Sequence, residues 1–288
     1  MKRATRPRPS LRAAARRTWS LLFAGVAAVA ADSASAHDGR EVSVVTLNLW
    51  HDAGDWPRRA ALIVRTLRTL RPDVIALQEV LQDRGLPNQA KTIADALGFR
   101  YVFASVDAAD KPRRYGNAIL TRHRILAQGW KALAPLDDYR VALHLRIAVD
   151  GEPVEVYATH LHWTPEGGAI RRAQVEDLEA YIAVASAPDA PTVVAGDFNA
   201  PANAPEFAPL LARLRDAYDV LHACAAQDDA GHSTLNLAFY APLRIDHVLY
   251  DPRAWTPLSA TRLFDRPAAD GTWASDHYGV RAVLRRRP

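Results

Sequence analysis

Short apolar runs alternate along this chain with segments whose apolar residues recur at helical spacing. Apolar, β-branched runs bounded by turn residues predict strands at 42–49, 74–77, 101–104, 117–121, 141–149, 154–159, 192–195, 245–250 and 278–284. Helical spacing predicts helices at 57–70, 89–97 and 169–184. Pro57 suits a first helical turn, and Gly98 suits a helix end. Strands interspersed with helices and hairpins indicate an α/β (α+β) chain of mixed sheets with helices packed outside.

The first 36 residues differ from the rest of the chain. Seven Lys and Arg residues precede an apolar run at 19–31, and Ala34-Ser35-Ala36 forms a small-x-small cleavage site. The apolar run is shorter than the ~20 residues that a membrane-spanning helix needs. We therefore expect residues 1–36 to be a signal peptide, residues 37–288 to be one domain, and the protein to be exported, either periplasmic or secreted. An uncleaved anchor is the alternative, and Arg16-Arg17 leaves twin-arginine export open beside the general secretory route.

Setting this segment aside changes the charge of the chain. The sequence has 36 Lys and Arg against 32 Asp and Glu, and residues 1–36 hold seven of the basic and one of the acidic residues. The remaining 29 basic and 31 acidic residues give a net charge of −2. Net charge therefore gives no support to an electropositive nucleic-acid surface. Cys224 is the only cysteine, which excludes an intramolecular disulfide and a thiolate metal centre, and we interpret it as a buried structural thiol.

Polar residues gather where the predicted apolar strands begin and end. Such groups in α/β sheets often converge on a binding site, whereas strand interiors build the core. Singly, each has a structural explanation, because Asn terminates strands, Gly-Asp-Phe-Asn forms turns, and Asp residues form surface ion pairs. Their joint arrangement is the informative feature. These residues are Asn48, Glu79, His160, Asp197, Asn199, Asp246, Asp276 and His277.

The segments around these residues resemble the endonuclease/exonuclease/phosphatase superfamily, in its branch with deoxyribonuclease I and the sphingomyelinases. They occur in family order and span nearly all of the chain after residue 36. The resemblance implies a four-layer sandwich of two mixed β-sheets packed face to face, with helices outside and the active site at one edge. The matching segments are TLNLW (46–50), ALQEV (76–80), YGNAILTR (115–122), YATHLHW (157–163), VVAGDFNAP (193–201), RIDHVLYDP (244–252) and ASDHYGV (274–280).

The resemblance also implies a metal ion. Glu79 would be the main ligand of Mg²⁺, with Mn²⁺ as the alternative, and Asn48 would lie beside it. Asp276 would hold a second metal position or a water. Oxygen ligands suit a hard cation that offsets the charge developing on a phosphoester during hydrolysis.

The same resemblance assigns catalytic roles. Asp197 and Asn199 would orient or activate the attacking water. His277, with its tautomer fixed by Asp246, would bind the phosphoryl oxygen or act as the base, and the roles of Asp197 and His277 are interchangeable at this stage. His160 separates the branches, because abasic-site endonucleases of the superfamily carry Tyr there, and it would protonate the leaving oxygen.

Two further residues are candidate substrate contacts. His162 lies two positions after His160, on the same face if the strand continues, and the alternative is a structural neighbour. Arg140 starts a strand and could contact phosphate, with a solvated side chain as the alternative.

We therefore expect a monomeric, exported, Mg²⁺-dependent hydrolase of a phosphodiester or phosphomonoester, with a phospholipid headgroup or small phosphodiester as its phosphorylated substrate. A secreted nuclease is the alternative, with nucleic acid as substrate, and a non-catalytic binding protein that retains the fold is a second. No long apolar hairpin stands out for membrane contact, and we assign Trp130, Trp163 and Trp255 to the core.

Overall fold

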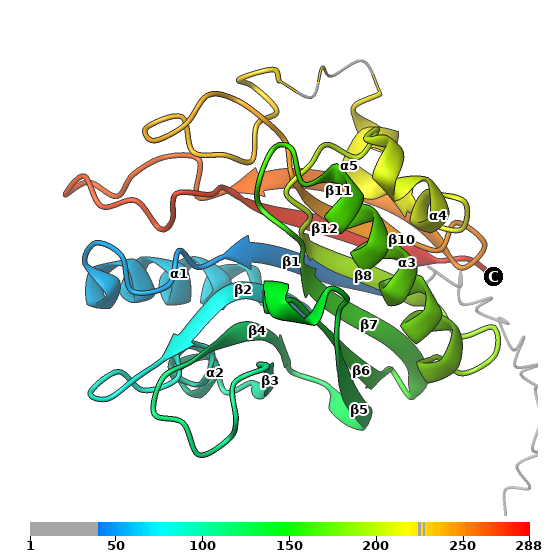
Figure 1. The fold of residues 1–288 in the computed structure, drawn as a ribbon, viewed down its shortest axis with the longest axis horizontal. Helices are drawn as coiled ribbons and strands as arrows, with labels where there is room; N and C mark the ends of the chain where they lie inside the picture. The colour runs from blue at the N-terminus through cyan, green and yellow to red at the C-terminus, as the bar shows by residue number, and fades with distance from the viewer. Residues whose placement is uncertain (1–39, 224–225, 227) are drawn as a thin grey trace, which may run out of the picture. The chain divides into compact units, whose positions relative to one another are not determined.

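The computed structural model describes residues 40–223, 226 and 228–288 (Figure 1). The predicted signal peptide and Cys224 lie outside the described residues. From Arg40 onward, the described chain belongs to a single compact unit. No helix in the described ranges has both the length and the apolar character needed to cross a membrane.

The unit contains two six-stranded sheets. The first has the order β11-β12-β1-β2-β4-β3, and its only parallel neighbours are β1 and β2. Its strands are β1 (Glu41–Asn48), β2 (Val74–Gln82), β3 (Arg100–Ala104), β4 (Arg114–Thr121), β11 (Trp255–Leu263) and β12 (Gly279–Arg286).

The second sheet repeats this plan. Its order is β5-β6-β7-β8-β10-β9, and its only parallel neighbours are β7 and β8. Its strands are β5 (Arg124–Ala132), β6 (Val141–Val149), β7 (Glu152–His160), β8 (Thr192–Asp197), β9 (Arg215–Asp216) and β10 (Asp246–Tyr250).

Helices cover the outer faces of both sheets (Figure 1). The helices α1 and α2 pack on the first sheet, whereas α3 and α4 pack on the second. This four-layer arrangement confirms the fold expected from the sequence. The helical segments are α1 (Trp56–Leu70), α2 (Gln89–Leu97), η1 (Leu136–Asp138), α3 (Gly168–Ala185), η2 (Pro205–Phe207), α4 (Ala208–Leu211) and α5 (Ala217–Leu221).

Alternation along β1 explains how one strand serves two layers. Val42 and Val44 point into the core between the two sheets, whereas Val45 and Leu47 point outward under α1. Successive side chains of a strand face opposite sides, so an unbroken apolar run is what a strand buried on both faces requires. The first predicted strand of the domain is therefore a central strand.

Two edge strands escape prediction from the sequence. β5 and β11 lie at the outer edges of their sheets, where much of each strand faces solvent. Their mixture of polar and small residues gives no apolar alternation. The assignment of three tryptophans to the core was correct for Trp255 but wrong for Trp163 and Trp130, whose exposed fractions are 66% and 50%.

β2 is longer than the apolar run 74–77. It continues to Gln82 through an irregularity in its pairing with β4, between Leu77 and Val80. Glu79 lies inside this irregularity with a left-handed φ of 54°. Glu79 therefore does not close the strand; a bulge re-aims its side chain within it.

Candidate active site

The ends of the central strands meet across the two sheets. Asn48 ends β1 of the first sheet, and its Nδ2 donates to Asp197 Oδ2 of the second sheet at 2.9 Å. Asp197 ends β8, where it pairs with His160 of β7 on one side and Asp246 of β10 on the other. Four residues far apart in the sequence are thus fixed together by strand register and one hydrogen bond.

A glycine allows this close packing next to Asp197. A Cβ atom at Gly196 would lie only 2.1 Å from the carbonyl oxygen of Thr159 on β7. Real Cβ atoms do not approach a backbone oxygen so closely, so any side chain here would push β8 away from β7. Gly196 therefore contributes to the positions of both His160 and Asp197.

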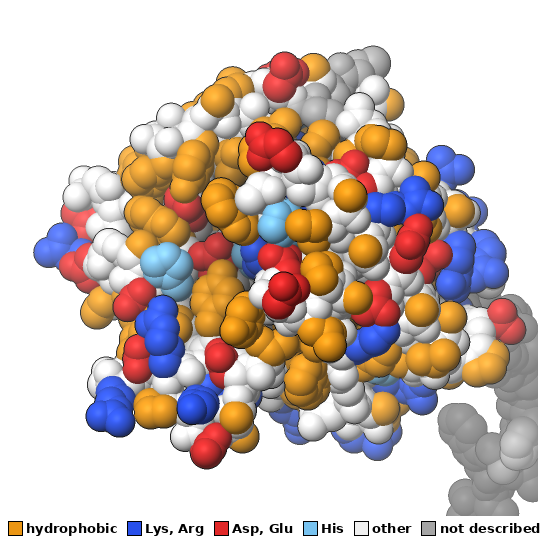
Figure 2. All heavy atoms as spheres, in the orientation of Figure 1, with side chains coloured by type: hydrophobic (Ala, Val, Ile, Leu, Met, Phe, Trp, Pro, Cys, Tyr) orange, Lys and Arg blue, Asp and Glu red, His pale blue; other side chains and the backbone are white. Residues whose placement is uncertain are grey.

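Eight of the ten site residues expected from the sequence line one cleft of 730 Å³. Figure 2 shows apolar surface beside a hollow that contains acidic and His side chains. Asp246 lies behind the cleft wall and contacts His277. His162 also lies outside the lining of the cleft. The lining residues expected from the sequence are Asn48, Glu79, Arg140, His160, Asp197, Asn199, Asp276 and His277.

Two carboxylates hold His277 at the base of the cleft. Its Nδ1 lies 2.9 Å from Asp246 Oδ2, and its Nε2 lies 3.8 Å from Asp197 Oδ2. Burial by itself would lower the pKa of His277, but Asp246 and Asp197 raise it to about 10. The two carboxylates therefore favour the protonated imidazole, which suits binding of a phosphoryl oxygen.

The pKa of Asp197 is also raised, but here the shift favours the neutral form of the side chain. Burial raises its pKa most, followed by the nearby charge of Asp246, while His277, Asn48 and the Asn199 amide oppose them; the resulting pKa is about 7. A carboxylate with a raised pKa can take a proton from water near neutral pH. The sequence left the base open between Asp197 and His277, and these pKa directions favour Asp197.

His160 faces Asp197 from β7. Its Nε2 lies 3.5 Å from Asp197 Oδ2, while its buried Nδ1 has no hydrogen-bond partner. Burial, then the positive charges of Arg140 and His277, hold its pKa well below the usual value. The ring is neutral in the protein alone, so an anion bound in the cleft would be needed to make it a proton donor.

Glu79 enters the cleft from the bulge of β2. The hydroxyl of Tyr115, at the start of β4, forms a hydrogen bond with its carboxylate, and burial with this negative charge raises the pKa of that hydroxyl. Asp276 also lies there, accepting from Tyr240 Oη at 3.1 Å and from Ser275 Oγ at 3.2 Å. Two carboxylates and the Asn48 amide therefore line one part of the cleft.

The remaining expected residues take different positions. Asn199 donates its backbone N–H to Asp197 Oδ1 at 2.9 Å and its side-chain N–H to the Leu161 carbonyl at 3.0 Å. The Arg140 side chain is only 10% exposed and its Nε forms an ion pair with Asp138 Oδ2 at 3.6 Å, so the solvated alternative is wrong. His162 lies beyond the end of β7, its Nδ1 2.8 Å from Asp138 and its Nε2 2.8 Å from Thr164.

Family comparison agrees with this geometry. Residues 45–277 match the model of the Endonuclease/Exonuclease/phosphatase family. The chain belongs to this family. No curated protein matches the sequence significantly.

Solved structures of the family share the fold. Humanized D. rerio TDP2 aligns with a TM-score of 0.70 and 20% identity, over 85% of this chain and 99% of that chain. The human Nocturnin catalytic domain, with bound sulfate, aligns with a TM-score of 0.68 and 21% identity, over 86% and 94%. A family member from Beutenbergia cavernae aligns with a TM-score of 0.65 and 23% identity, over 86% and 72%. At these identities the likeness establishes the fold.

Family members use divalent metals, and the residues of this cleft fit such an ion. Hard oxygen donors line one part of the wall: the carboxylates of Glu79 and Asp276 and the side-chain Oδ1 of Asn48. Asp197, Asp246 and His277 also offer ligand atoms that all lie within 4.8 Å of one another, and Asp246 Oδ1 has no hydrogen-bond partner. The first set consists of oxygen donors alone, which a hard cation such as Mg²⁺ prefers.

Several other lining residues of the cleft were not expected from the sequence, among them Tyr115, Trp50 and Tyr240. Tyr115 and Trp50 lie inside the segments YGNAILTR and TLNLW, so the motifs contained them without marking them. Tyr240 lies in an irregular segment with no periodicity. Only tertiary contact with Asp276 reveals it.

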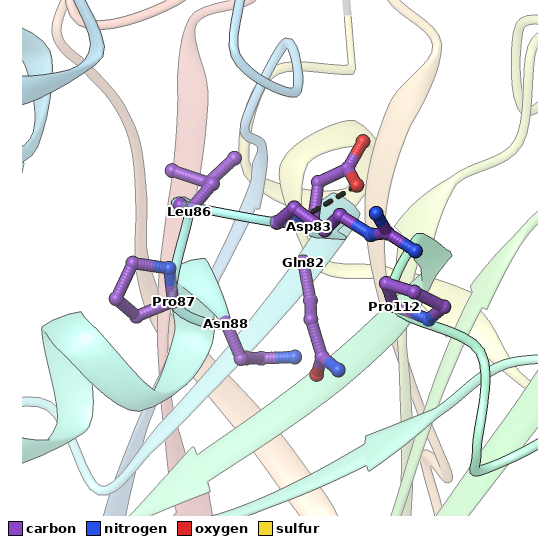
Figure 3. A pocket seen from close by; sticks show the side chains of 8 residues that line it. Gln82, Asp83, Leu86, Pro87, Asn88 and Pro112 are labelled. Carbon is purple, nitrogen blue, oxygen red and sulfur yellow. Dashed lines mark hydrogen bonds between the residues drawn. The ribbon is translucent and has the colours of Figure 1, made fainter.

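A second pocket lies at the end of β2 and carries a different residue set. It measures 420 Å³ and is formed by the turn at 82–88 and by Pro112 (Figure 3). Asp83 and Leu86 exchange two backbone hydrogen bonds of 3.0 Å that close the turn. Its only ionisable lining groups are Asp83 and Arg84, so it lacks the constellation described above.

Proposed function

We propose that this protein is an exported, Mg²⁺-dependent phosphoester hydrolase that cleaves a phosphodiester or phosphomonoester, with a phospholipid headgroup as its substrate. The observation that carries the proposal is the cleft itself. A protonated His277 lies between Asp197 and Asp246, beside a second group of oxygen donors on the same wall. The predicted signal peptide supports export.

Each residue has a chemical role in this proposal. Asp197 accepts the proton of the attacking water, and the amide of Asn199 fixes the carboxylate that does so. His277, held by Asp246, donates to a phosphoryl oxygen, and His160 donates to the leaving oxygen.

The metal site completes the proposal. Glu79, Asn48 and Asp276 hold Mg²⁺, which when bound neutralises charge on the phosphoryl group and the leaving oxygen. Arg140 provides a buried positive charge on the same wall.

The rim of the cleft favours an amphiphilic substrate. Three segments, 133–140, 161–168 and 234–243, contribute Arg140, Trp163 and Tyr240 to the cleft. Arg140 is their only Lys or Arg, and the last segment has no charged residue. Exposed apolar patches mark contact with apolar partners, whereas binding to nucleic acid requires several cations. The exposed apolar side chains on these segments are Leu136, Tyr139, Trp163, Leu237, Phe239 and Tyr240.

A secreted nuclease is the second candidate. The structure of D. rerio TDP2 was solved with a single-strand DNA product, and it aligns with this chain at a TM-score of 0.71 and 19% identity. Exposed aromatic side chains can also stack on bases. A nuclease should lose affinity steeply with salt, because each phosphate contact releases counterions.

The deciding experiment is a hydrolysis assay with Mg²⁺ on sphingomyelin and phosphatidylcholine vesicles, plasmid DNA, bis-nitrophenyl phosphate and nitrophenyl phosphate. Turnover should disappear with EDTA, return with Mg²⁺ or Mn²⁺, and disappear in Glu79→Ala. Preference for vesicles supports the lipid substrate, and salt-sensitive DNA cleavage supports the nuclease. No turnover from folded, metal-loaded protein on any of them would favour a binding protein that retains the fold.

A matched pair of variants tests the rim. Trp163→Ala should weaken binding to phosphatidylcholine vesicles, whereas Trp130→Ala should not, because Trp130 is similarly exposed on β5 outside the cleft. Loss of about tenfold in vesicle affinity is the scale expected for one large apolar side chain. Equal behaviour of the two variants would contradict the role of the rim.

A further inference from the structure

One buried arginine connects the two loops that carry the site. Arg59 lies on α1 with an exposed fraction of 2%. A guanidinium has five N–H donors in a fixed planar fork. All five donate to backbone carbonyls, at distances between 2.6 and 3.3 Å. The acceptors are the carbonyl oxygens of Leu49, Trp50, His51, Ala53 and Ala274.

The guanidinium of Arg59 contacts backbone carbonyls and aromatic rings rather than carboxylates. Its guanidinium lies 5.4 Å from the ring centroid of Trp50 and 5.3 Å from that of Trp56. No carboxylate within the described part of the chain forms an ion pair with it. Burial lowers its pKa to about 10, against the opposing charges of Asp276 and its acidic neighbours. Arg59 is therefore still charged at neutral pH.

The five carbonyls belong to two segments of the cleft wall. Four lie in 49–53, directly after Asn48, where Trp50 and His51 have left-handed φ values of 56° and 35°. Two successive non-glycine residues in this region are strained and need support from their surroundings. The fifth belongs to Ala274, 215 residues along the chain from Arg59 and two before Asp276.

A second contact joins the same segments. Ser275 Oγ donates to the Asn48 carbonyl at 2.7 Å, and the His277 amide donates to Ser275 Oγ at 3.1 Å. Arg59 and Ser275 thus bind the loop after β1 to the loop before β12. These loops carry Asn48 on one side and Asp276 with His277 on the other.

We infer that Arg59 is a positioning residue that holds the Asn48 loop and the Asp276–His277 loop at the spacing which divalent-ion binding and phosphoester hydrolysis require. The inference rests on the proposed function for its catalytic consequence, but the loop geometry can be tested without turnover. Lysine cannot replace it, because its three donors on one nitrogen cannot reach five carbonyls arranged around a planar fork.

The experiment compares Arg59→Lys and Arg59→Gln with Arg58→Gln. Arg58 is the neighbouring residue of α1, and its exposed side chain pairs only with Asp55 and Asp270. Hydrogen exchange should rise at 49–53 and 274–277 in both Arg59 variants, while the other strands keep their protection. Arg58→Gln should leave both segments unchanged. Arg59→Lys is the decisive variant if Arg59→Gln unfolds.

Mg²⁺ binding and turnover extend the same test. Calorimetry should show Mg²⁺ affinity reduced about 10- to 100-fold in Arg59→Lys, the range for groups that orient metal ligands. On whichever substrate is cleaved, kcat should fall about 100-fold with a smaller change in KM.

Each contrary result has its own meaning. Unchanged exchange and unchanged Mg²⁺ affinity per folded molecule, with only a lower melting temperature, would show a purely structural role and overturn the inference. Absence of turnover in the unsubstituted protein would refute the proposed function instead, and exchange with Mg²⁺ binding would still decide the role of Arg59.

Discussion

Strand β10 carries two neighbouring residues that enter two very different His–Asp pairs. Asp246 faces the cleft and pairs with His277, whereas His247 faces the other side of the sheet and pairs with Asp216. The distances are similar, 2.9 Å for the first pair and 2.5 Å for the second. Both pairs are buried, so neither distance nor burial separates them.

The pair at Asp216 satisfies its own hydrogen bonds. Asp216 accepts from the Tyr218 amide at 2.6 Å, from His247 and from Arg244 Nη1 at 3.2 Å. His247 Nε2 lies 3.0 Å from the Ala200 carbonyl. Burial opposes ionisation, yet His247 and Arg244 hold the pKa of Asp216 below its usual value. The side-chain oxygens of Asp216 and both ring nitrogens of His247 thus all have partners, and a pair of this kind stabilises the fold.

The pair at Asp246 keeps unused hydrogen-bonding capacity. Asp246 Oδ1 has no hydrogen-bond partner, and His277 Nε2 has only a distant carboxylate, 3.8 Å away at Asp197. The pKa of Asp197 is raised where that of Asp216 is lowered. The two pairs therefore differ in what they leave unsatisfied: His277 lines the cleft, so its Nε2 is available to a substrate, whereas no side-chain polar atom of the Asp216–His247 pair is.

The largest effect should come from Asp246→Asn. An amide removes the charge that keeps His277 protonated and oriented, so turnover should fall on the order of 1,000-fold, about 4 kcal/mol in activation free energy. Stability should change little, because the substitution also relieves repulsion with Asp197. Steady-state kinetics with urea unfolding measures both quantities. Near-normal turnover would show that this pair is also structural.

Asp216→Asn should have the reverse effect, a loss of stability with little change in turnover. Asp216→Asn leaves buried Arg244 without a full countercharge there, and the free energy of unfolding should fall by about 3 kcal/mol. Turnover per folded molecule should stay within about twofold, because none of the Asp216 contacts described above reaches the cleft. Urea denaturation followed by circular dichroism is the measurement. A stable but inactive Asp216→Asn protein would contradict the structural role of the Asp216–His247 pair.

The smallest effect should be a pH dependence of the stability difference between the unsubstituted protein and Asp216→Asn. The pKa of Asp216 is lower in the folded protein than its ordinary value of 3.8, so its ionisation contributes stability above pH 3.8. The stability gap between the unsubstituted protein and Asp216→Asn should therefore be constant at higher pH. It should narrow as the pH falls through the lower folded pKa. A stability difference that increases as the pH falls would refute the lowered pKa of Asp216.

The sequence predicted the centre of each sheet better than its edges. Central strands such as β1 are buried on both faces, and their apolar runs identify them directly. The edge strands β5 and β11 carry residues suited to solvent, so they leave no distinct pattern. The helices α1 and α2 were predicted because periodicity coincided with Pro57 and Gly98.

The residues of the site also fall into those that the sequence predicted and those that it did not. Residues at strand ends, such as Asn48 and Asp197, follow from motifs and strand positions. Arg59 and Tyr240 could not be predicted, since the contacts that tie them to the Asp276 segment lie 215 and 36 residues away along the chain. The bulge at Glu79 was also hidden, because a left-handed glutamate has no signature in the sequence.

The pairing of β1 with β12 has a consequence for how the chain folds. Arg281 of β12 donates to Ser43 of β1 across a separation of 238 residues. During synthesis, β1 and β2 emerge early, yet β1 keeps an open edge until β12 arrives. Such long-range pairing slows folding and leaves apolar edges open to aggregation. Since His277 directly precedes β12, the cleft acquires this imidazole only after the strands that carry Asn48, His160, Asp197 and Asp246 have been synthesised.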